Sequence, residues 1–138
     1  MIAVQNSRWR QALPAAAVLS ASWPAMADVN GVWKTQTADD GGYLEVTVGA
    51  CAADSSKICS TISKAFKKSG EDSGYNNLGK LMIKDMTADD ATSFSRGTIR
   101  GPEKDKTYSS KMTLKGDELD VEGCVAILCQ GQAWKRVK

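Results

Sequence analysis

Four cysteines in two close pairs constrain this protein more than any other feature of its sequence. Seven residues separate Cys51 from Cys59, and four separate Cys124 from Cys129. Both pairs follow an apolar N-terminal segment of the kind that directs export, so we expect the thiols to reach an oxidising compartment. Each pair would then close a short loop between strand-like segments, which favours a small disulfide-stapled β structure.

Four cysteines allow three disulfide connectivities, and the spacing favours 51–59 and 124–129. The chain-entropy model gives each bridge of this loop size about 2–3 kcal/mol of stability. A metal site is the alternative, but the sequence has no His and neither pair has the two-residue spacing of zinc knuckles. A redox site is also disfavoured, because the sequence has no Cys-x-x-Cys. We therefore predict structural disulfides at Cys51, Cys59, Cys124 and Cys129, and no metal.

Residues 1–27 are predicted to form a secretory signal peptide. Arg8 and Arg10 precede an apolar run from Ala12 to Trp23, and small residues end the segment at Ala27. The apolar run is shorter than the roughly 20 residues that cross a bilayer. Cleavage before Asp28 would leave a periplasmic or secreted domain over residues 28–138, without stable insertion in a membrane.

The mature domain would carry balanced charge. Removing Arg8 and Arg10 from the 18 basic residues leaves 16, which equal the 16 acidic residues. Such a domain lacks the basic surface that attracts nucleic acid or an anionic membrane, so we expect no nucleic-acid partner.

Short strand-like runs alternate with turn residues along the whole mature sequence, and no long segment has a helical period. Leu44, Val46 and Val48 share one face of a strand, and Tyr108, Ser110, Met112 and Leu114 share a face of another. The eight expected strands are 31–36, 42–48, 58–66, 80–86, 92–100, 106–115, 118–126 and 131–137. They predict an all-β, eight-stranded antiparallel up-and-down barrel, whose interior is filled by side chains or holds one small ligand.

Two connections are too long or too acidic to be simple turns. Residues 67–79 are polar and Gly-rich and do not fit a strand, so they predict a lid, a binding loop or a disordered segment. Residues 87–91 contain Asp89 and Asp90. Neither connection has the spacing of a calcium loop, so we place no metal there.

Several motifs, in order, carry a family resemblance. Gly31-Val32-Trp33 resembles the opening Gly-x-Trp of lipocalin-like, or calycin, barrels. Arg96-Gly97-Thr98-Ile99 with Pro102 and Lys106-Thr107-Tyr108, and the C-terminal stretch from Val121 to Val137, resemble an exported bacterial family, domain-of-unknown-function family 2147 (DUF2147). The resemblance covers nearly all of residues 30–137. It implies a lipocalin-like barrel with an internal cavity, and it leaves the ligand undefined.

The sequence departs from the family pattern around the expected mouth of the barrel. Asn76-Asn77 replaces Asn-Pro, Arg100-Gly101 stands where the family tends to have Tyr-Asp, and Asp105 replaces the Gly before Lys106. A ligand shared by the family is therefore not assumed for this protein.

The resemblance also assigns structural roles. Gly31, Trp33 and Arg136 are expected to close one end of the barrel, with the Arg136 guanidinium across the Trp33 ring. Trp134 has the parity of Arg136 on the last strand. The candidate cavity-lining residues are Tyr108, Met112, Leu114 and Trp134. Each of them is also suited to packing in a filled core.

Catalysis has little support in the sequence. There is no His to act as a base, and Asp39-Asp40 and Asp89-Asp90 occur at turns, where acids serve local hydrogen bonds. We expect no enzyme, no catalytic residues and no cofactor. The leading hypothesis is a barrel that binds a small, largely apolar ligand. A protein-binding module, such as a periplasmic enzyme inhibitor or a cell-envelope interaction protein, is the alternative, and a structural envelope protein is a third class.

Overall fold

The computed structural model describes residues 29–101 and 104–138. The predicted signal peptide, residues 1–27, lies outside the described residues. Within the described ranges no helix has the length and apolar character needed to cross a membrane.

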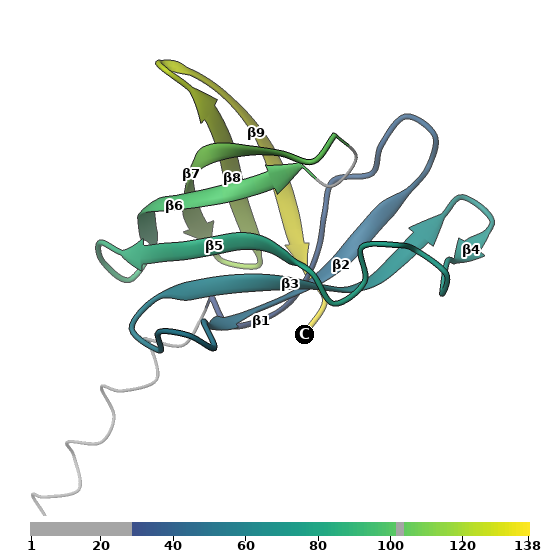
Figure 1. The fold of residues 1–138 in the computed structure, drawn as a ribbon, viewed down its shortest axis with the longest axis horizontal. Helices are drawn as coiled ribbons and strands as arrows, with labels where there is room; N and C mark the ends of the chain where they lie inside the picture. The colour runs from purple at the N-terminus through teal and green to yellow at the C-terminus, as the bar shows by residue number, and fades with distance from the viewer. Residues whose placement is uncertain (1–28, 102–103) are drawn as a thin grey trace, which may run out of the picture.

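All regular structure in the described residues is β-strand (Figure 1). The strands are β1 (Gly31–Lys34), β2 (Tyr43–Ala50), β3 (Ile58–Lys67), β4 (Gly70–Glu71), β5 (Leu81–Ala88), β6 (Ser93–Gly101), β7 (Lys106–Lys115), β8 (Glu118–Val125) and β9 (Leu128–Arg136).

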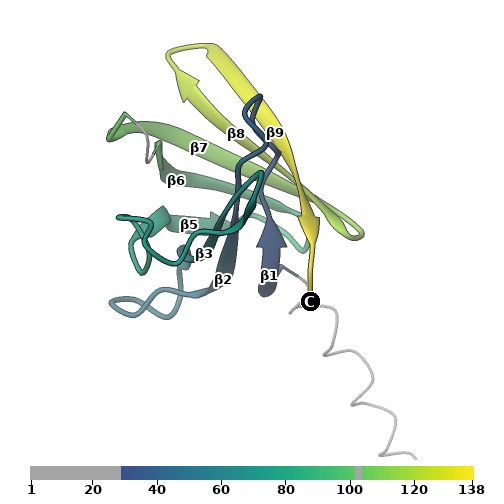
Figure 2. The same ribbon diagram turned by 90° about the vertical axis from the view of Figure 1, so that its right-hand side faces the viewer.

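Antiparallel pairing carries the sheet around into a closed cylinder. Starting from β2, the order is β2-β1-β9-β8-β7-β6-β5-β3, and β2 also pairs with β3. The long strands cross one another in the tilted arrangement of a barrel, seen from two sides in Figures 1 and 2. The predicted eight-stranded antiparallel barrel is therefore confirmed.

Most strand boundaries differ from the sequence prediction by one to three residues, and three differences have a clear cause in the pairing. Residues 67–79 were expected to contain no strand, but β4 within them pairs with the end of β3 through Phe66↔Glu71 and Lys67↔Gly70. β5 continues to Ala88 because Ala88 pairs with Phe94. β9 begins at Leu128 and not at Gly131, because Cys129 lies directly opposite Cys124 and extends the hairpin. In each case pairing with a neighbour overrides weak local strand character.

The core fills the cylinder on the inward faces of the strands. Among the described residues, five side chains are fully buried, namely Trp33, Trp134, Val46, Met86 and Leu119, and Ile62, Ile83 and Val121 are almost as completely buried. These residues belong to one continuous apolar cluster. The period-two alternation of the sequence produces this cluster, since one side of each strand faces inward.

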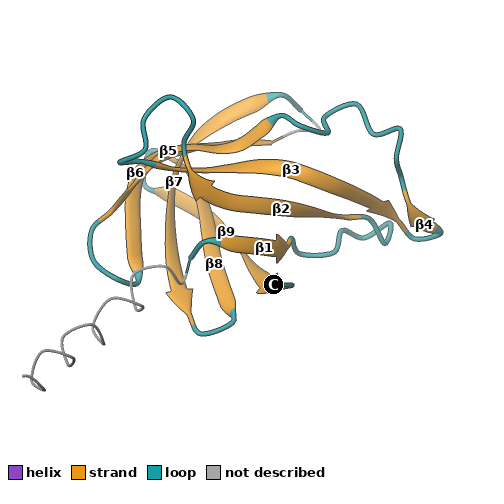
Figure 3. Ribbon diagram, turned by 90° about the horizontal axis from the view of Figure 1, so that it is seen from below, coloured by secondary structure: helices purple, strands orange, loops and turns teal. Residues whose placement is uncertain are grey.

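The two ends of the barrel differ. At one end Gly31 meets the C-terminal residue, and Val32 N donates a hydrogen bond to the carbonyl of Lys138. At the other end, which we call the mouth, lie the β1–β2 loop, the connection between β3 and β5, and the tip of the β8–β9 hairpin. Figure 3 shows β2 and β3 running on toward β4, beyond the end of β1.

Candidate functional site

A pocket opens at the mouth of the barrel. Its volume is about 710 Å³, and it lies between the β1–β2 loop, the ends of β2 and β3, and the β3–β5 connection. Small-molecule sites in proteins span a similar range of volume, roughly 300–1,000 Å³. The mouth pocket is therefore large enough for a small ligand.

Apolar side chains form the deep part of the mouth pocket. Leu44 on β2, Ala65 on β3 and Met82 on β5 line it, and Ala65 and Met82 are buried. Leu44 and Met82 also pack into the core cluster. The floor of the pocket is thus formed by residues that pack in or against the core.

An aromatic pair stands beside this floor. Tyr43 on β2 and Phe66 on β3 are register partners, and their rings stack with centroids 4.7 Å apart. The Lys34 ammonium lies 4.3 Å from the centroid of the Tyr43 ring. Neighbouring residues of a strand face opposite sides, so these stacked rings lie on the strand face opposite to Leu44 and Ala65, at the edge of the pocket.

Two polar side chains on the barrel wall reach the same pocket. The Thr35 hydroxyl accepts a hydrogen bond from Leu44 N at 2.9 Å. The side-chain carbonyl of Gln132 accepts one from the indole nitrogen of Trp134 at 2.7 Å. That bond fixes the amide of Gln132, and its NH₂ group remains a donor for a ligand.

Charges of both signs surround the rim. Asp40, Lys67, Lys68 and Asp72 all line the pocket, and Lys67 Nζ lies 3.9 Å from an Asp72 carboxylate oxygen. Asp40 accepts a hydrogen bond from Gly42 N at 2.8 Å, which stabilises its turn. The rim therefore selects neither anions nor cations by net charge.

The four candidate cavity residues lie elsewhere. Trp134, Met112 and Leu114 are buried together in the core cluster. Tyr108 is half-buried on β7, opposite Ile99 of β6. None of the four is among the residues that line the mouth pocket.

The residues of the mouth itself were not predicted from the sequence. Alternation along strands identifies inward side chains, but the pocket is built where strands end. Two signals were available: the long connection over residues 67–79, predicted as a lid, a binding loop or a disordered segment, contains Tyr75, and the β1–β2 turn contains Asp40. Tyr75 is partly buried against the core and lines the pocket.

Gly31, Trp33 and Arg136 meet at the end of the barrel opposite the mouth. The Arg136 guanidinium lies 4.4 Å from the centroid of the Trp33 ring, and its Nε donates to an Asp117 carboxylate at 3.1 Å. A Cβ on Gly31 would lie 2.5 Å from the carbonyl oxygen of Lys138. Only glycine fits there, because the first and last strands approach so closely.

A smaller pocket of about 470 Å³ lies at this same end. Val29, Ile58, Ala88 and Phe94 contribute to its lining.

Three carboxyl groups among the described residues have a pKa below the ordinary Asp value, and all three lie outside the mouth pocket. Hydrogen bonds from Ser56 lower the pKa of Asp54, backbone bonds from Thr92 and Ser93 lower that of Asp90, and a bond from Lys115 lowers that of Asp120. These hydrogen bonds stabilise turns and a strand pair on the surface, so they do not mark a reactive site.

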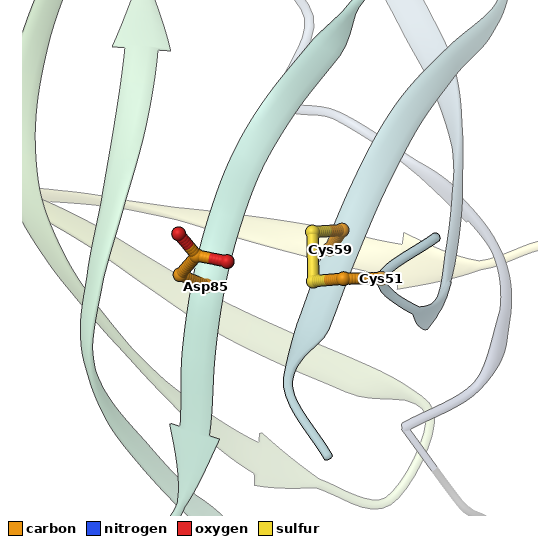
Figure 4. A group of neighbouring side chains, drawn as sticks. All are labelled: Cys51, Cys59 and Asp85. Atoms are coloured by element: carbon orange, nitrogen blue, oxygen red, sulfur yellow. A yellow bond between two sulfur atoms is a disulfide. The ribbon is translucent and has the colours of Figure 1, made fainter. Parts of the chain in front are cut away.

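Both disulfides form with the expected pairing, Cys51–Cys59 and Cys124–Cys129. Two side-chain groups among the described residues have the proximity of metal ligands: Asp85 beside Cys51–Cys59 (Figure 4), and Glu122 beside Cys124–Cys129. In each group the sulfur atoms are bonded to one another, so they are not the thiolates that bind metal ions. These groups are structural bridges with a carboxylate nearby.

Comparison with known proteins identifies the family. The model of the family described as an uncharacterised protein conserved in bacteria (DUF2147) matches residues 31–136, which is most of the sequence. This chain belongs to the DUF2147 family. No curated protein sequence matches it.

The DUF2147 barrel described above is also similar to a solved structure. Protein HP1028 from the human pathogen Helicobacter pylori, described as belonging to the lipocalin family, superposes with a TM-score of 0.61. The match covers 79% of this chain and 82% of that chain at 12% sequence identity. At this identity the likeness shows a shared lipocalin-like fold, and function is argued from the site itself.

Proposed function

We propose that this protein binds a small, largely apolar molecule in the mouth pocket. The observation that carries this proposal is a pocket of about 710 Å³ whose floor is Leu44, Ala65 and Met82. An apolar ligand would cover this apolar surface, and burial of such surface supplies roughly 25 cal/mol per Å². The lipocalin-like fold supports the proposal by analogy only.

The polar groups of the pocket suggest how such a ligand is oriented. Its apolar body would lie on the floor formed by Leu44, Ala65 and Met82. A hydrogen-bond acceptor on the ligand would meet the amide of Gln132 on the wall. Because the rim carries Lys67 and Lys68 together with Asp40 and Asp72, we propose a ligand without a strong net charge.

We propose that the protein acts by binding and not by catalysis. The rim carboxylate of Asp40 is committed to its own turn through Gly42 N. The sequence has no His, and its cysteines are in disulfides. The residues that line the pocket therefore offer no paired nucleophile and base.

The two disulfides indicate an oxidising, non-cytoplasmic location. Together with the predicted signal peptide, they support export to the periplasm or the medium. The ligand would then be a molecule present outside the cytoplasm.

The mouth pocket is tested by filling it. Ala65 is buried on the pocket floor, so Ala65→Phe should occupy the space and weaken binding of the uncharged, apolar fluorophore N-phenyl-1-naphthylamine by about tenfold or more. Ala88→Phe is the matched control, since Ala88 lines the small pocket at the opposite end. Denaturation curves establish that both variants are folded.

Native mass spectrometry and organic extraction of the exported protein would identify what it carries. A co-purifying apolar molecule that is lost in Ala65→Phe and kept in Ala88→Phe supports the proposal. If the fluorophore binds the Ala65→Phe variant as tightly as the original protein, the mouth pocket is not its site.

A further inference from the structure

The last strand of the barrel is longer than the partner that closes it. β9 begins at Leu128, but β1 pairs with it only through Trp33↔Arg136 and Lys34↔Lys135. Along residues 128–132 of β9, no strand of the described ranges pairs on the side away from β8. β9 therefore keeps an open edge between its pairing with β1 and its tip.

The hydrogen bonds at the end of β9 show which residues face this edge. Val137 N donates to Val32 O on the β1 side, whereas Arg136 N donates to Asp117 O on the β8 side. Backbone groups alternate along a strand, so Ala133, Gly131 and Cys129 face the same side as Val137. Ala133 N agrees with this direction, since it donates to the side chain of Gln36 at 3.4 Å.

A second measurement supports the same alternation. The Cα atoms of Cys124 and Cys129 are 4.0 Å apart, as expected for an antiparallel pair that exchanges no backbone bonds with each other. The N–H and C=O of Cys129 thus point away from β8. The open edge presents the backbone groups of Cys129 and Gly131, and an unpaired edge is a template for another strand.

The tip of the same hairpin is strongly apolar. Val125 is 60% exposed, Ile127 is 93% exposed and Leu128 is 76% exposed. The β8–β9 hairpin projects beyond the rest of the barrel at the top of Figure 2. The Cys124–Cys129 disulfide holds this tip in shape, so the apolar side chains are presented by a rigid element.

We propose that β9 pairs with β9 of a second copy of this protein, antiparallel, about a two-fold axis at Gln130. Cys129 then lies opposite Gly131 of the second copy, and the pair exchanges both N–H···O bonds. The two-fold symmetry forms the same pair of hydrogen bonds on the other side of the axis. The open backbone groups of each copy are therefore hydrogen-bonded to the other copy.

Gln36 selects this register over its nearest competitor. An axis at Gly131 would place Cys129 opposite Ala133 of the second copy, whose N–H is already held by Gln36. The axis at Gln130 uses only the backbone groups that the described structure leaves at the open edge.

The register brings an apolar residue of the second copy to the mouth pocket. Leu128 of the second copy lies opposite Gln132, which lines the pocket. Leu128, Gln132 and Trp134 have the same parity on β9, and Trp134 is buried inside the barrel. Leu128 of the second copy therefore adds apolar surface beside the pocket, and each barrel completes the mouth of the other.

The pairing is tested by removing one edge donor. Gly131→Pro deletes the N–H directed at the edge, and proline is tolerated on an open edge. Sedimentation velocity should show twice the monomer mass for the oxidised protein and a monomer for Gly131→Pro. Gly131→Ala is the control, since it keeps the N–H and its Cβ would meet the flexible side chain of Glu122 at 3.3 Å.

A crosslink tests the axis independently, in case Gly131→Pro fails to fold. Gln130→Cys should form a 130–130 disulfide between copies under mild oxidation, because facing residues of such a pair lie about 4.5 Å apart. Lys84→Cys, at an exposed position of β5, should not crosslink. Peptide mapping establishes that the native bridges remain.

A monomer at every concentration would overturn the proposal, and so would a dimer that gives no 130–130 link. The pocket floor belongs to a single copy, so fluorophore binding and its loss in Ala65→Phe can be measured on a monomer as well, and the two proposals fail separately.

Discussion

At the scale of single residues, the distance to neighbouring backbone atoms decides at which glycines a side chain would destabilise the fold. A Cβ on Gly97 would lie 2.8 Å from Lys84 O and 2.9 Å from Met86 Cα. Asp85 and Arg96, on the two strands that meet there, both have positive φ. The sequence identified Gly97 as part of a family motif, but its physical reason depends on the pairing of β5 with β6, which no local pattern encodes.

We predict that Gly97→Ala destabilises the protein by about 2 kcal/mol or more, because the methyl group would push β6 away from the β5 backbone. Gly49→Ala is the matched control. No atom lies within 4 Å of a Cβ on Gly49, so its effect should stay within about 0.5 kcal/mol. Urea denaturation of the oxidised proteins measures both. Equal stability of the two variants would contradict the close approach of β5 and β6.

At the scale of elements, the sequence pattern of short strand-like runs between turn residues located all eight barrel strands. It failed where neither alternation nor turn residues decide the boundary. The residues Leu128, Cys129 and Gln130 have no clear period, and only pairing with β8 makes them strand. The mouth pocket was missed for a related reason, since Tyr75 and Asp40 belong to connections whose course depends on the whole barrel.

The β5–β6 turn predicts a pH dependence. Asp90 accepts backbone hydrogen bonds from Thr92 N at 2.9 Å and Ser93 N at 2.8 Å, which lower its pKa. A depressed folded-state pKa stabilises the protein above the unfolded pKa, near 4, and this contribution disappears as the pH falls through the folded pKa.

Asp90→Asn should therefore flatten the decline of unfolding free energy below about pH 4, because an amide oxygen accepts similar bonds without titrating. Denaturation at a series of acidic pH values measures the slope. Asp39→Asn removes the same charge from an exposed turn and controls for net charge. An unchanged slope in Asp90→Asn would show that these bonds do not couple to folding.

At the scale of the whole molecule, closure of the barrel rests on a short pairing between its first and last strands. β1 is four residues long, and only Trp33 and Lys34 pair with β9. The Arg136 side chain reinforces this seam through the Trp33 ring, Asp117 and the carbonyl of Asn30. The family resemblance anticipated the contact of Trp33 with Arg136, whereas the shortness of the pairing is visible only in the fold.

Arg136→Ala should lower the free energy of unfolding by about 2 kcal/mol, since a guanidinium on an indole face and its hydrogen bonds are lost together. The free energy of unfolding of Arg136→Lys should lie between those of the original protein and Arg136→Ala. The lysine ammonium keeps the positive charge but lacks the planar, forked donors of the guanidinium. In a Trp33→Phe background, Arg136→Ala should lower the free energy of unfolding by less than it does in the original protein. The same cost in both backgrounds would show that the ring contact adds nothing to stability.

The two disulfides sit in different surroundings. Cys51 and Cys59 are buried, with 5% and 7% of their surface exposed, whereas Cys129 is in contact with solvent at the hairpin tip. A mild reductant would reach the second bond first and loosen the apolar tip while the cylinder stayed intact. The protein therefore has one disulfide that is shielded from solvent and one that a reductant in solution can reach.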